Sequence, residues 1–275
     1  MFVKCFKRTL TGGLAAAALF IVAADAAEFP FNRAGALVSP AACREAGDIQ
    51  VPLARSAAAG AHVYDFKSLY NSLGYPSPGY FGATEDEVMD LTTYTSKEDT
   101  FYGEINGYLR FYPAPYEWYG TGPEDAKVIV EHIDRVFNRA PVIPGDIILF
   151  RGLGLGWHGN KPFKAGEEFT DKGYVSTSVS YSVARYFALE TGDEEKPSRR
   201  AVFAVYFTRP SEKAILVDQG EEEVMLPRGR KFRVMSGKEA VKAYDLYLVQ
   251  ACASACETQL RADVGDFWNK FRVQD

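Results

Sequence analysis

The hydrophobic pattern of the chain changes at Pro144-Gly145, and this change limits the folds that are open to it. From about residue 61 to 140, apolar residues recur every three or four positions, as they do in amphipathic helices. Beyond this point, short runs rich in valine, isoleucine, phenylalanine and tyrosine are separated by glycine, proline and charged residues, which is typical of strands joined by turns. A helical front followed by a β-rich back predicts an α+β fold with a sheet of many short strands.

Individual segments support both halves of this pattern. The clearest predicted helix, GPEDAKVIVEHIDRVFNRA, opens with Pro123 and acidic residues and closes with Arg135 and Arg139, which suits the charge preferences of helix ends. EDEVMDLTTYTS and TFYGEINGYLRFY are also predicted to be helical. The predicted strands lie in DIILFRGL, GEEFTDKGYVSTSVS, RRAVFAVYF, KAILVDQG, EEEVMLPRG, GRKFRVMSG and YDLYLVQAC, with YSVARYFALE as the helical insert among them.

Residues 1–26 have the layout of a secretory signal peptide. A basic start is followed by an apolar stretch at 13–23 and by the small-x-small cleavage site Ala24-Asp25-Ala26. The apolar stretch is too short to span a bilayer. We therefore expect a secreted protein, extracellular or periplasmic in transit, with no membrane span. The remainder divides into an Ala/Pro/Gly-rich arm at 27–60, a main domain at 61–255 and a C-terminal tail at 256–275.

The charge balance excludes one class of partner. The full chain has a net charge of −5, and residues 1–26 hold three positive charges and one negative charge, so the chain without them has a net charge of −7. Binding to a phosphate backbone needs clustered cations, so we expect no nucleic-acid partner. A hydrophobic content of 47% is enough for a packed core.

The cysteines predict one disulfide. Cys5 leaves with the signal peptide, and Cys43, Cys252 and Cys256 remain in an oxidising compartment. We expect Cys43 to pair with Cys252 or Cys256, because a Cys252–Cys256 bridge within one helical turn is geometrically unfavourable. With three histidines in the chain and no Cys-x-x-Cys, no metal site is expected.

Three short stretches of the β-rich half contain candidate ligand-binding or catalytic residues. Arg151-Gly152 ends the apolar run DIILF, where a guanidinium can hold a phosphate and a glycine lets a ligand approach the backbone. Ser176-Thr177-Ser178 interrupts another run, and alternation puts Ser176 and Ser178 on one face of a strand and Thr177 on the other. Taken singly, a surface-paired arginine and an edge-strand decoration are the commoner explanations of these two patterns.

The third stretch is the acidic run of Glu221, Glu222 and Glu223. In an extended segment Glu221 and Glu223 share a face, while Glu222 points away toward solvent. Two carboxylates on one face suit a displacement at an anomeric carbon: one stabilises positive charge at the sugar and the other takes a proton from the nucleophile. Alone, the run is more commonly a solvated acidic turn.

Together, the three stretches form an Arg/Ser-Thr-Ser/Glu-x-Glu pattern. In this pattern the chain resembles the mono-ADP-ribosyltransferase toxins over residues 65–250, on the side of the binary actin-modifying toxins, the insecticidal vegetative toxin and the C-three-like exoenzymes. Four segments are similar to the corresponding segments of that family: ILFRGL, FTDKGYVSTSVSYSVARYFA, GEEEVMLPRGRKFRV and YTSKEDTFYGEINGYLR. The resemblance implies an ADP-ribosyltransferase domain at 61–255, in which a helical N-terminal part packs on two small, mainly antiparallel sheets that form an NAD cleft.

The resemblance also implies roles for residues. NAD would serve as co-substrate, with no metal, and Glu223 would be the carboxylate that stabilises the ribose cation. Glu221 would orient or deprotonate the acceptor, and Ser176 would position Glu223. The residues implied to bind NAD are Arg151, Gly152, Thr177, Ser178, Tyr94, Asn106 and Arg110. The sequence departs from some binary toxins in having one arginine at the first strand and none within AVFAVYF, so its phosphate contacts are expected to differ.

The acceptor and the partners follow from the same resemblance. In the family, Glu-x-Glu goes with arginine acceptors, and a carboxylate holds a guanidinium better than an amide does. We therefore expect transfer to an arginine of a target protein, with host actin as one possible target. To reach a host cell, the chain would need a translocation or delivery partner, a dedicated secretion route or outer-membrane vesicles; the alternative is action in the periplasm or on neighbouring bacteria. The alternatives are an NAD glycohydrolase that uses water as acceptor and a catalytically silent binding module on the same fold.

Overall fold

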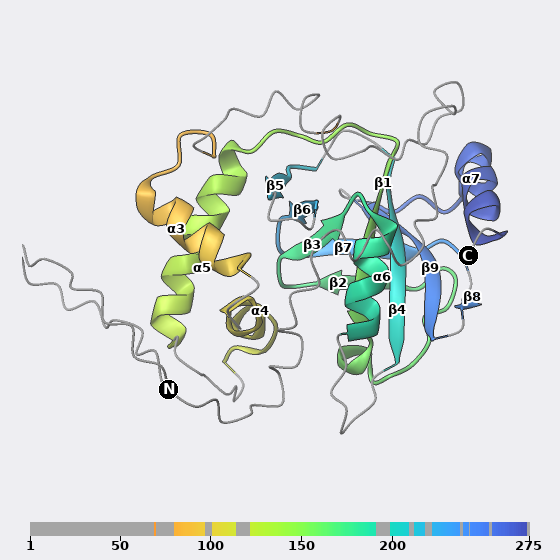
Figure 1. Ribbon diagram of the computed structural model, residues 1–275, viewed down its shortest axis with the longest axis horizontal. Helices are drawn as coiled ribbons and strands as arrows, with labels where there is room; N and C mark the ends of the chain where they lie inside the picture. The colour runs from red at the N-terminus through yellow and green to blue at the C-terminus, as the bar shows by residue number, and fades with distance from the viewer. Residues whose placement is uncertain are drawn as a thin grey trace, which may run out of the picture. The chain divides into compact units, whose positions relative to one another are not determined.

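Figure 1 shows the computed structural model of the chain. Every residue that the structure describes lies in one compact unit, Leu37–Asp275. The proposed signal peptide at 1–26 and the arm at 27–60 lie outside the described residues, and their boundaries stay predictions. No helix in the described part of the chain is long and apolar enough to cross a bilayer. The described residues are 69, 80–96, 101–113, 122–190, 199–208, 212–217, 222–236, 239–241, 243–252 and 255–273.

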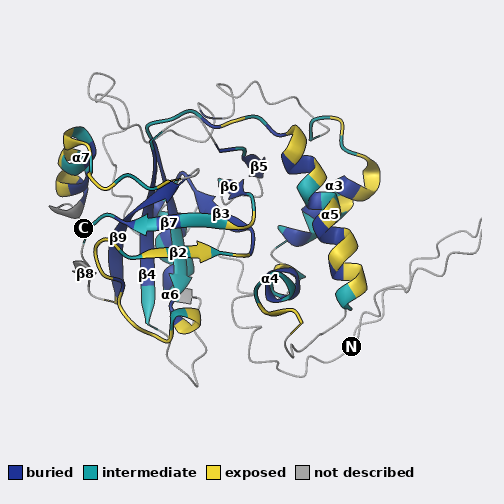
Figure 2. Cartoon of the chain, turned by 180° about the vertical axis from the view of Figure 1, so that it is seen from behind, coloured by how far each residue is buried: buried dark blue, intermediate teal, exposed yellow. Residues whose placement is uncertain are grey.

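The helical front contains α3 (Glu85–Tyr94), α4 (Phe101–Phe111) and α5 (Pro123–Arg139), as the apolar spacing predicts. The first turn of α3 is closed by a capping box, in which Thr84 and Glu87 each accept a hydrogen bond from the other's backbone N–H. Pro123 starts α5 at a position where its missing N–H is not needed. In Figure 2, α5 alternates between exposed and buried residues along its length, as expected for a helix with one face on a core.

The back half forms one nine-stranded sheet in the order β2-β7-β9-β4-β1-β3-β6-β5, with β8 paired to β9. Its pairings are antiparallel except that of β4 with β9. The helix α6 (Tyr181–Glu190) is the predicted insert, and η2 (Gly156–His158) and α7 (Ala262–Val273) complete the described elements. The strands are β1 (Ile147–Gly154), β2 (Glu168–Asp171), β3 (Val175–Ser178), β4 (Arg200–Phe207), β5 (Ile215–Val217), β6 (Glu223–Leu226), β7 (Arg230–Val234), β8 (Glu239–Val241) and β9 (Tyr244–Cys252).

The α+β fold class is therefore confirmed, and the two sheets that we expected are joined into one at a narrow junction. The only register pair between β1 and β3 is Phe150 opposite Ser178. This single pair divides the sheet into two halves, β2-β7-β9-β4-β1 and β3-β6-β5. Leu149 of the first half and Val224 of the second belong to the same core cluster, so the two halves pack on each other.

Two further clusters attach helices to the outer faces of these halves. Met225 of β6 belongs to a cluster with Leu91 of α3 and Ile133 of α5. The helices α3, α4 and α5 are called the helical layer below. Phe150 of β1 belongs to a cluster with Trp268 of α7, a helix that is not among the predicted ones. Gly152 lets α6 approach β1, because a Cβ there would lie 1.7 Å from the carbonyl oxygen of Ala184.

The disulfide expectation was wrong, because the structure joins Cys252 to Cys256. The expectation assumed that both cysteines lie within one helical turn. Instead, Cys252 ends the strand β9 and Cys256 follows in a stretch without helix, so their Cα atoms are 4.9 Å apart, a separation that a disulfide accommodates. Cys43 lies outside the described residues.

We expect peptide mapping under non-reducing conditions to recover residues 252 and 256 in one linked fragment. Because the bridge closes a very short loop, replacing both cysteines with serine should lower the free energy of unfolding by no more than about 2 kcal/mol. A fragment that links Cys43 to either of them would contradict this pairing.

Glu87 gives the helical layer a pH-dependent contribution to stability. Burial opposes its ionisation, but hydrogen bonds from Arg135, Thr84 and Arg139 lower the pKa of Glu87 to about 2. Since the folded pKa lies below the ordinary value of 4.5, the stabilisation is present above about pH 4.5 and is lost as the pH falls toward 2.

Glu87→Gln should therefore unfold at lower temperature than the wild type at pH 7, with a loss of about 2 kcal/mol for hydrogen bonds to a charged group. The difference should shrink as unfolding is measured at successively lower pH. Glu85→Gln, at an exposed position of the same helical turn, is the matched control and should change stability little at any pH. A difference for Glu87→Gln that stays constant down to pH 3 would refute the role of its charge.

Candidate functional site

A single row across three neighbouring strands brings the predicted motifs together. Phe150 of β1 pairs with Ser178 of β3, and Ser178 pairs with Glu223 of β6. Adjacent strands lie about 5 Å apart, so Glu223 lies roughly 10 Å from β1. Arg151 is the residue directly after Phe150. The arginine, the serine strand and the glutamate strand therefore meet at the junction between the two halves of the sheet.

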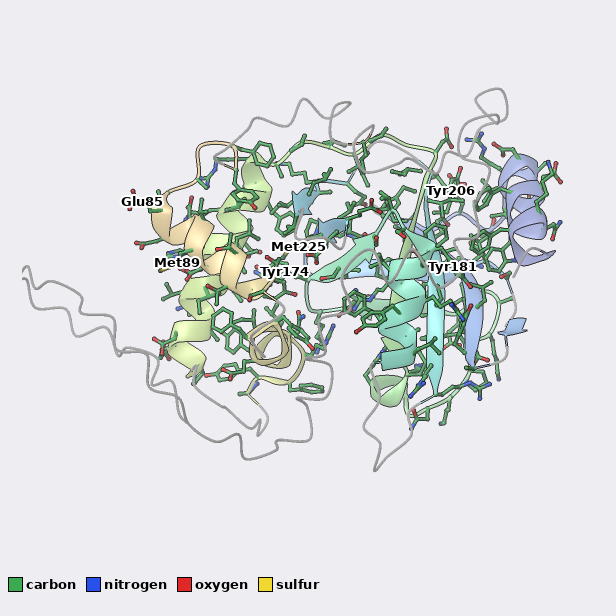
Figure 3. The ribbon with its side chains drawn as sticks, in the orientation of Figure 1. Glu85, Met89, Tyr174, Tyr181, Tyr206 and Met225 are labelled. Carbon is green, nitrogen blue, oxygen red and sulfur yellow. A yellow bond between two sulfur atoms is a disulfide. The ribbon has the colours of Figure 1, made fainter. Side chains whose placement is uncertain are left out.

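The register of β3 and β6 fixes which side chains share a face. Ser178 lies opposite Glu223 and Ser176 opposite Met225, so these four side chains are on one face, as strand alternation predicts. Met225 packs against the helical layer, which identifies this as the helix-facing side (Figure 3). Ser176 is exposed and Glu223 is 7% exposed. Exposed Ser176 and buried Glu223 therefore flank the same part of the sheet.

Thr177 and Ser178 support this arrangement from within the fold. Thr177 points to the opposite face and donates a hydrogen bond from its hydroxyl to the carbonyl of Val224. The Ser178 hydroxyl oxygen accepts a hydrogen bond from the backbone N–H of Ser180, 3.0 Å away, at the start of α6. Both residues are only 4% exposed. Their contacts hold strands and a helix start together, while contact with a dinucleotide stays a prediction.

The acidic run differs from its predicted geometry. Glu222 is not extended: its φ of 50° lies in the left-handed region, which an L-residue with a bulky side chain rarely adopts. It is also half-buried rather than solvent-facing, and its carbonyl accepts a hydrogen bond from Val179. The alternation that put Glu221 and Glu223 on one face therefore fails at Glu222. Glu221 itself lies outside the described residues.

Asp171 is the central residue that the sequence motifs missed. Its Oδ2 lies 3.1 Å from Nη2 of Arg151, and its Oδ1 lies 3.1 Å from Nε of Arg110. Its Oδ1 also accepts a hydrogen bond from the N–H of Gly173 at 3.0 Å. The Asp-x-Gly spacing could have predicted this turn, but nothing in the sequence could have placed two arginines around it.

The predicted helix residues gather beside this carboxylate. Asn106 is 8% exposed; its Oδ1 accepts a hydrogen bond from the N–H of Tyr174 at 3.0 Å, and its Nδ2 donates one to the Tyr94 hydroxyl at 2.8 Å. The Tyr174 hydroxyl donates to Asp134 of α5, and Tyr174 lies between the helices and the sheet in Figure 3. Tyr94, Asn106 and Arg110 therefore line the side of the helical layer that meets the β2–β3 connection.

Electrostatic interactions connect these groups. Burial raises the pKa of Tyr94 above its ordinary value; Asn106 acts against this, Glu223 adds to it, and Arg151 and Arg110 lower the pKa. Burial lowers the pKa of Arg151, whereas Asp171 and Glu223 raise it. The charges of Glu223 and Arg151 thus lie close enough to influence one buried phenol, and Glu223 also influences Arg151.

A narrow crevice beside Arg151 has aromatic walls. Trp157 stands at 49% exposure on η2, after the glycines of GLGLGW. The glycine-rich run leads into the short η2 and not into the α-helix that a dinucleotide-binding loop of the strand–turn–helix type needs. Within the described residues, no group of three or more His, Cys, Asp or Glu is placed to hold a metal ion. The crevice is lined by Arg151, Leu153, Trp157, Phe169, Asp171, Phe203, Val205 and Phe232.

Comparison with known proteins gives a consistent result. The sequence profile of the ADP-ribosyltransferase exoenzyme family matches residues 63–254, which is more than half of the chain. Among curated protein sequences, none matches significantly.

Three solved structures share the fold at low sequence identity. The ADP-ribosyltransferase Vis in complex with agmatine is 19% identical, with a TM-score of 0.55 over 70% of this chain and 86% of that chain. The Vis toxin from Vibrio splendidus is 18% identical, with a TM-score of 0.53 over 68% and 82%. The ADP-ribosylating toxin BECa of a C. perfringens binary enterotoxin, with NADH, is 18% identical, with a TM-score of 0.50 over 68% and 48%.

We predict that replacing Gly173 with alanine lowers the stability of the fold. A Cβ at this position would lie 2.3 Å from Oδ1 of Asn106, whose bonds to Tyr94 and Tyr174 leave it little freedom to move. We expect Gly173→Ala to lower the free energy of unfolding by about 1–3 kcal/mol, measured by urea denaturation.

Gly103 provides the matched control on the same helix as Asn106. Nothing lies within 4 Å of a Cβ there, and alanine is favoured over glycine inside a helix by about 1 kcal/mol. Gly103→Ala should therefore leave stability unchanged or raise it. If the two variants had equal midpoints of urea denaturation, the close approach of Asn106 to Gly173 would not contribute to stability.

Proposed function

Since the chain belongs to the ADP-ribosyltransferase exoenzyme family, we propose that it cleaves the nicotinamide–ribose bond of NAD and transfers the ADP-ribose to an arginine of a target protein. The row Phe150–Ser178–Glu223 carries this proposal, because it puts Arg151 and Glu223 at one junction. A cation for the phosphates and an anion for the ribose are the two charges that this reaction needs from the protein.

Glu223 is the group that lowers the activation free energy for cleavage of the nicotinamide–ribose bond. As the glycosidic bond breaks, its electron pair leaves with nicotinamide, and positive charge grows on the ribose. The side chain of Glu223 is held in β6 and is only 7% exposed, so water screens its charge weakly. Such a fixed anion binds the charged transition state more tightly than the neutral sugar, which accelerates the reaction.

The remaining residues hold and orient the dinucleotide. Arg151 and Arg110 bind the phosphates or the nicotinamide-side ribose, and Gly152 offers backbone groups to the nicotinamide amide. Ser176, exposed on the face that Glu223 shares, positions that glutamate. Thr177 and Ser178 support the site, and Tyr94 and Asn106 close it from the helical side.

The proposed acceptor is a guanidinium group. Glu221 would bind the incoming arginine and accept the proton that its nitrogen loses when the new bond to the ribose forms. The complex of the fold relative Vis with agmatine, a compound that carries a guanidinium, supports this choice. Carboxylates hold guanidinium groups through paired hydrogen bonds that an amide cannot match.

The setting of the reaction is also proposed. We infer export through the signal peptide at 1–26, action as a toxin on a host protein such as actin, and a delivery partner that carries the chain to it.

The first test is Glu223→Gln. Nicotinamide release from NAD should fall by about two to three orders of magnitude, because the amide cannot offset the ribose cation. Glu222→Gln is the matched control, one residue away, and should keep most of the activity. Incubation with labelled NAD and a host-cell lysate should label a band with the wild type and not with Glu223→Gln. Equal nicotinamide release by the two proteins would remove Glu223 from the mechanism.

Glu221→Gln separates transfer from hydrolysis. With agmatine as acceptor, we expect its transfer rate to fall at least tenfold while nicotinamide release in water changes less. Loss of both activities to the same extent would show that Glu221 acts on NAD and not on the acceptor.

A further inference from the structure

We infer that Asp171 is a positioning residue, which holds Arg110 and Arg151 as a pair that binds the phosphates of NAD. This inference rests on the proposed function, since it takes NAD as the ligand of the two arginines. Asp171 belongs to none of the motifs that the sequence offered, and its role follows from its contacts.

Asp171 joins two arginines from different layers of the fold. Arg110 lies in the last turn of α4 and bonds to Asp171 through Nε and Nη2, at 3.1 and 3.0 Å from Oδ1. Arg151 lies on β1 and bonds through Nη2, at 3.1 Å from Oδ2. One carboxylate at the end of β2 therefore sets the distance between a cation on a helix and a cation on a strand.

The charges explain why this carboxylate is needed. Two guanidinium groups that share one anion repel each other when the anion is removed. The side chains of Arg151 and Asp171 are only 16% and 13% exposed, so solvent can replace the lost interaction only in part. Without Asp171, the more exposed Arg110, at 32%, is free to turn toward solvent, and Arg151 loses the acceptor that fixes its orientation.

The pairing leaves one donor of Arg151 unused. Its Nη1 is buried and has no hydrogen-bond partner among the residues that the structure describes. Buried donors in folded proteins nearly always have a partner, and a guanidinium has several N–H donors directed along different edges. Asp171 thus fixes the group through Nη2, and no partner among the described residues would have to be displaced from Nη1 by a phosphate oxygen. This geometry favours positioning over competition for the phosphate site.

The test is a comparison of KM and kcat for NAD cleavage in Asp171→Asn. The variant keeps the shape of the side chain but loses the charge that balances two cations. We expect KM for NAD to rise about tenfold, with kcat within about threefold of the wild type, because Glu223 is untouched. Direct titration with NAD in a Glu223→Gln background, in which the ligand is not consumed, should show the same rise in Kd.

Asp134→Asn is the matched control. Asp134 of α5 also forms an ion pair between the helical layer and the sheet region, with Nη2 of Arg228 2.7 Å from its Oδ2, but it lies outside the arginine pair. If Asp171 only joined layers, both variants would lose stability and neither would change KM. We expect both to lose stability and only Asp171→Asn to raise KM.

The outcomes separate this inference from the proposed function. A folded wild type that neither binds nor cleaves NAD would reject the proposed function itself. An active wild type with an unchanged KM in Asp171→Asn would reject positioning, and a lower KM would show that Asp171 competes with the phosphates. If Asp171→Asn does not fold, Asp171→Glu decides: it keeps the charge but displaces the carboxylate, so an unchanged KM there would overturn the inference.

Discussion

The site depends on the hydrogen bonds by which the β2–β3 connection holds α4 against the sheet. Asp171 accepts bonds from Arg110 of α4 and Arg151 of β1, and three residues later Tyr174 donates its N–H to Asn106. Gly173 makes this approach possible, since any Cβ would collide with Asn106. Because these contacts involve buried polar groups, each lost partner leaves another unsatisfied, and the connection acts as a unit.

The second requirement is the narrow junction between the halves of the sheet. With Phe150–Ser178 as the only register pair of β1 and β3, the strands diverge directly beyond the row that leads to Glu223. A wider pairing would cover the Arg151 end of β1 with another strand. The short pairing leaves space there for side chains from β2 and α4. Under the proposed function, Arg151 and Glu223 can then approach one NAD molecule without pairing with each other along a strand.

The acidic run becomes understandable in this setting. Three consecutive glutamates repel one another, yet the chain separates them: Glu223 enters β6 and is buried, while Glu222 takes a left-handed conformation that breaks the alternation. Arg151 supplies positive charge near Glu223, and the charge of Glu223 in turn raises the pKa of Arg151. Under the proposed function, this positive charge offsets the negative charge of Glu223.

The sequence alone determined the elements and the motifs. The residue patterns predicted α3, α4, α5 and the strands other than β8, and the Arg/Ser-Thr-Ser/Glu-x-Glu pattern identified the family that the profile match shows. Tertiary structure alone decided the Cys252–Cys256 pairing, the conformation of Glu222 and the place of Asp171. The physical reason is range: periodicity and capping depend on neighbours in the chain, whereas Asp171 meets Arg110 across 61 positions, a contact that only the packing of α4 on the sheet creates.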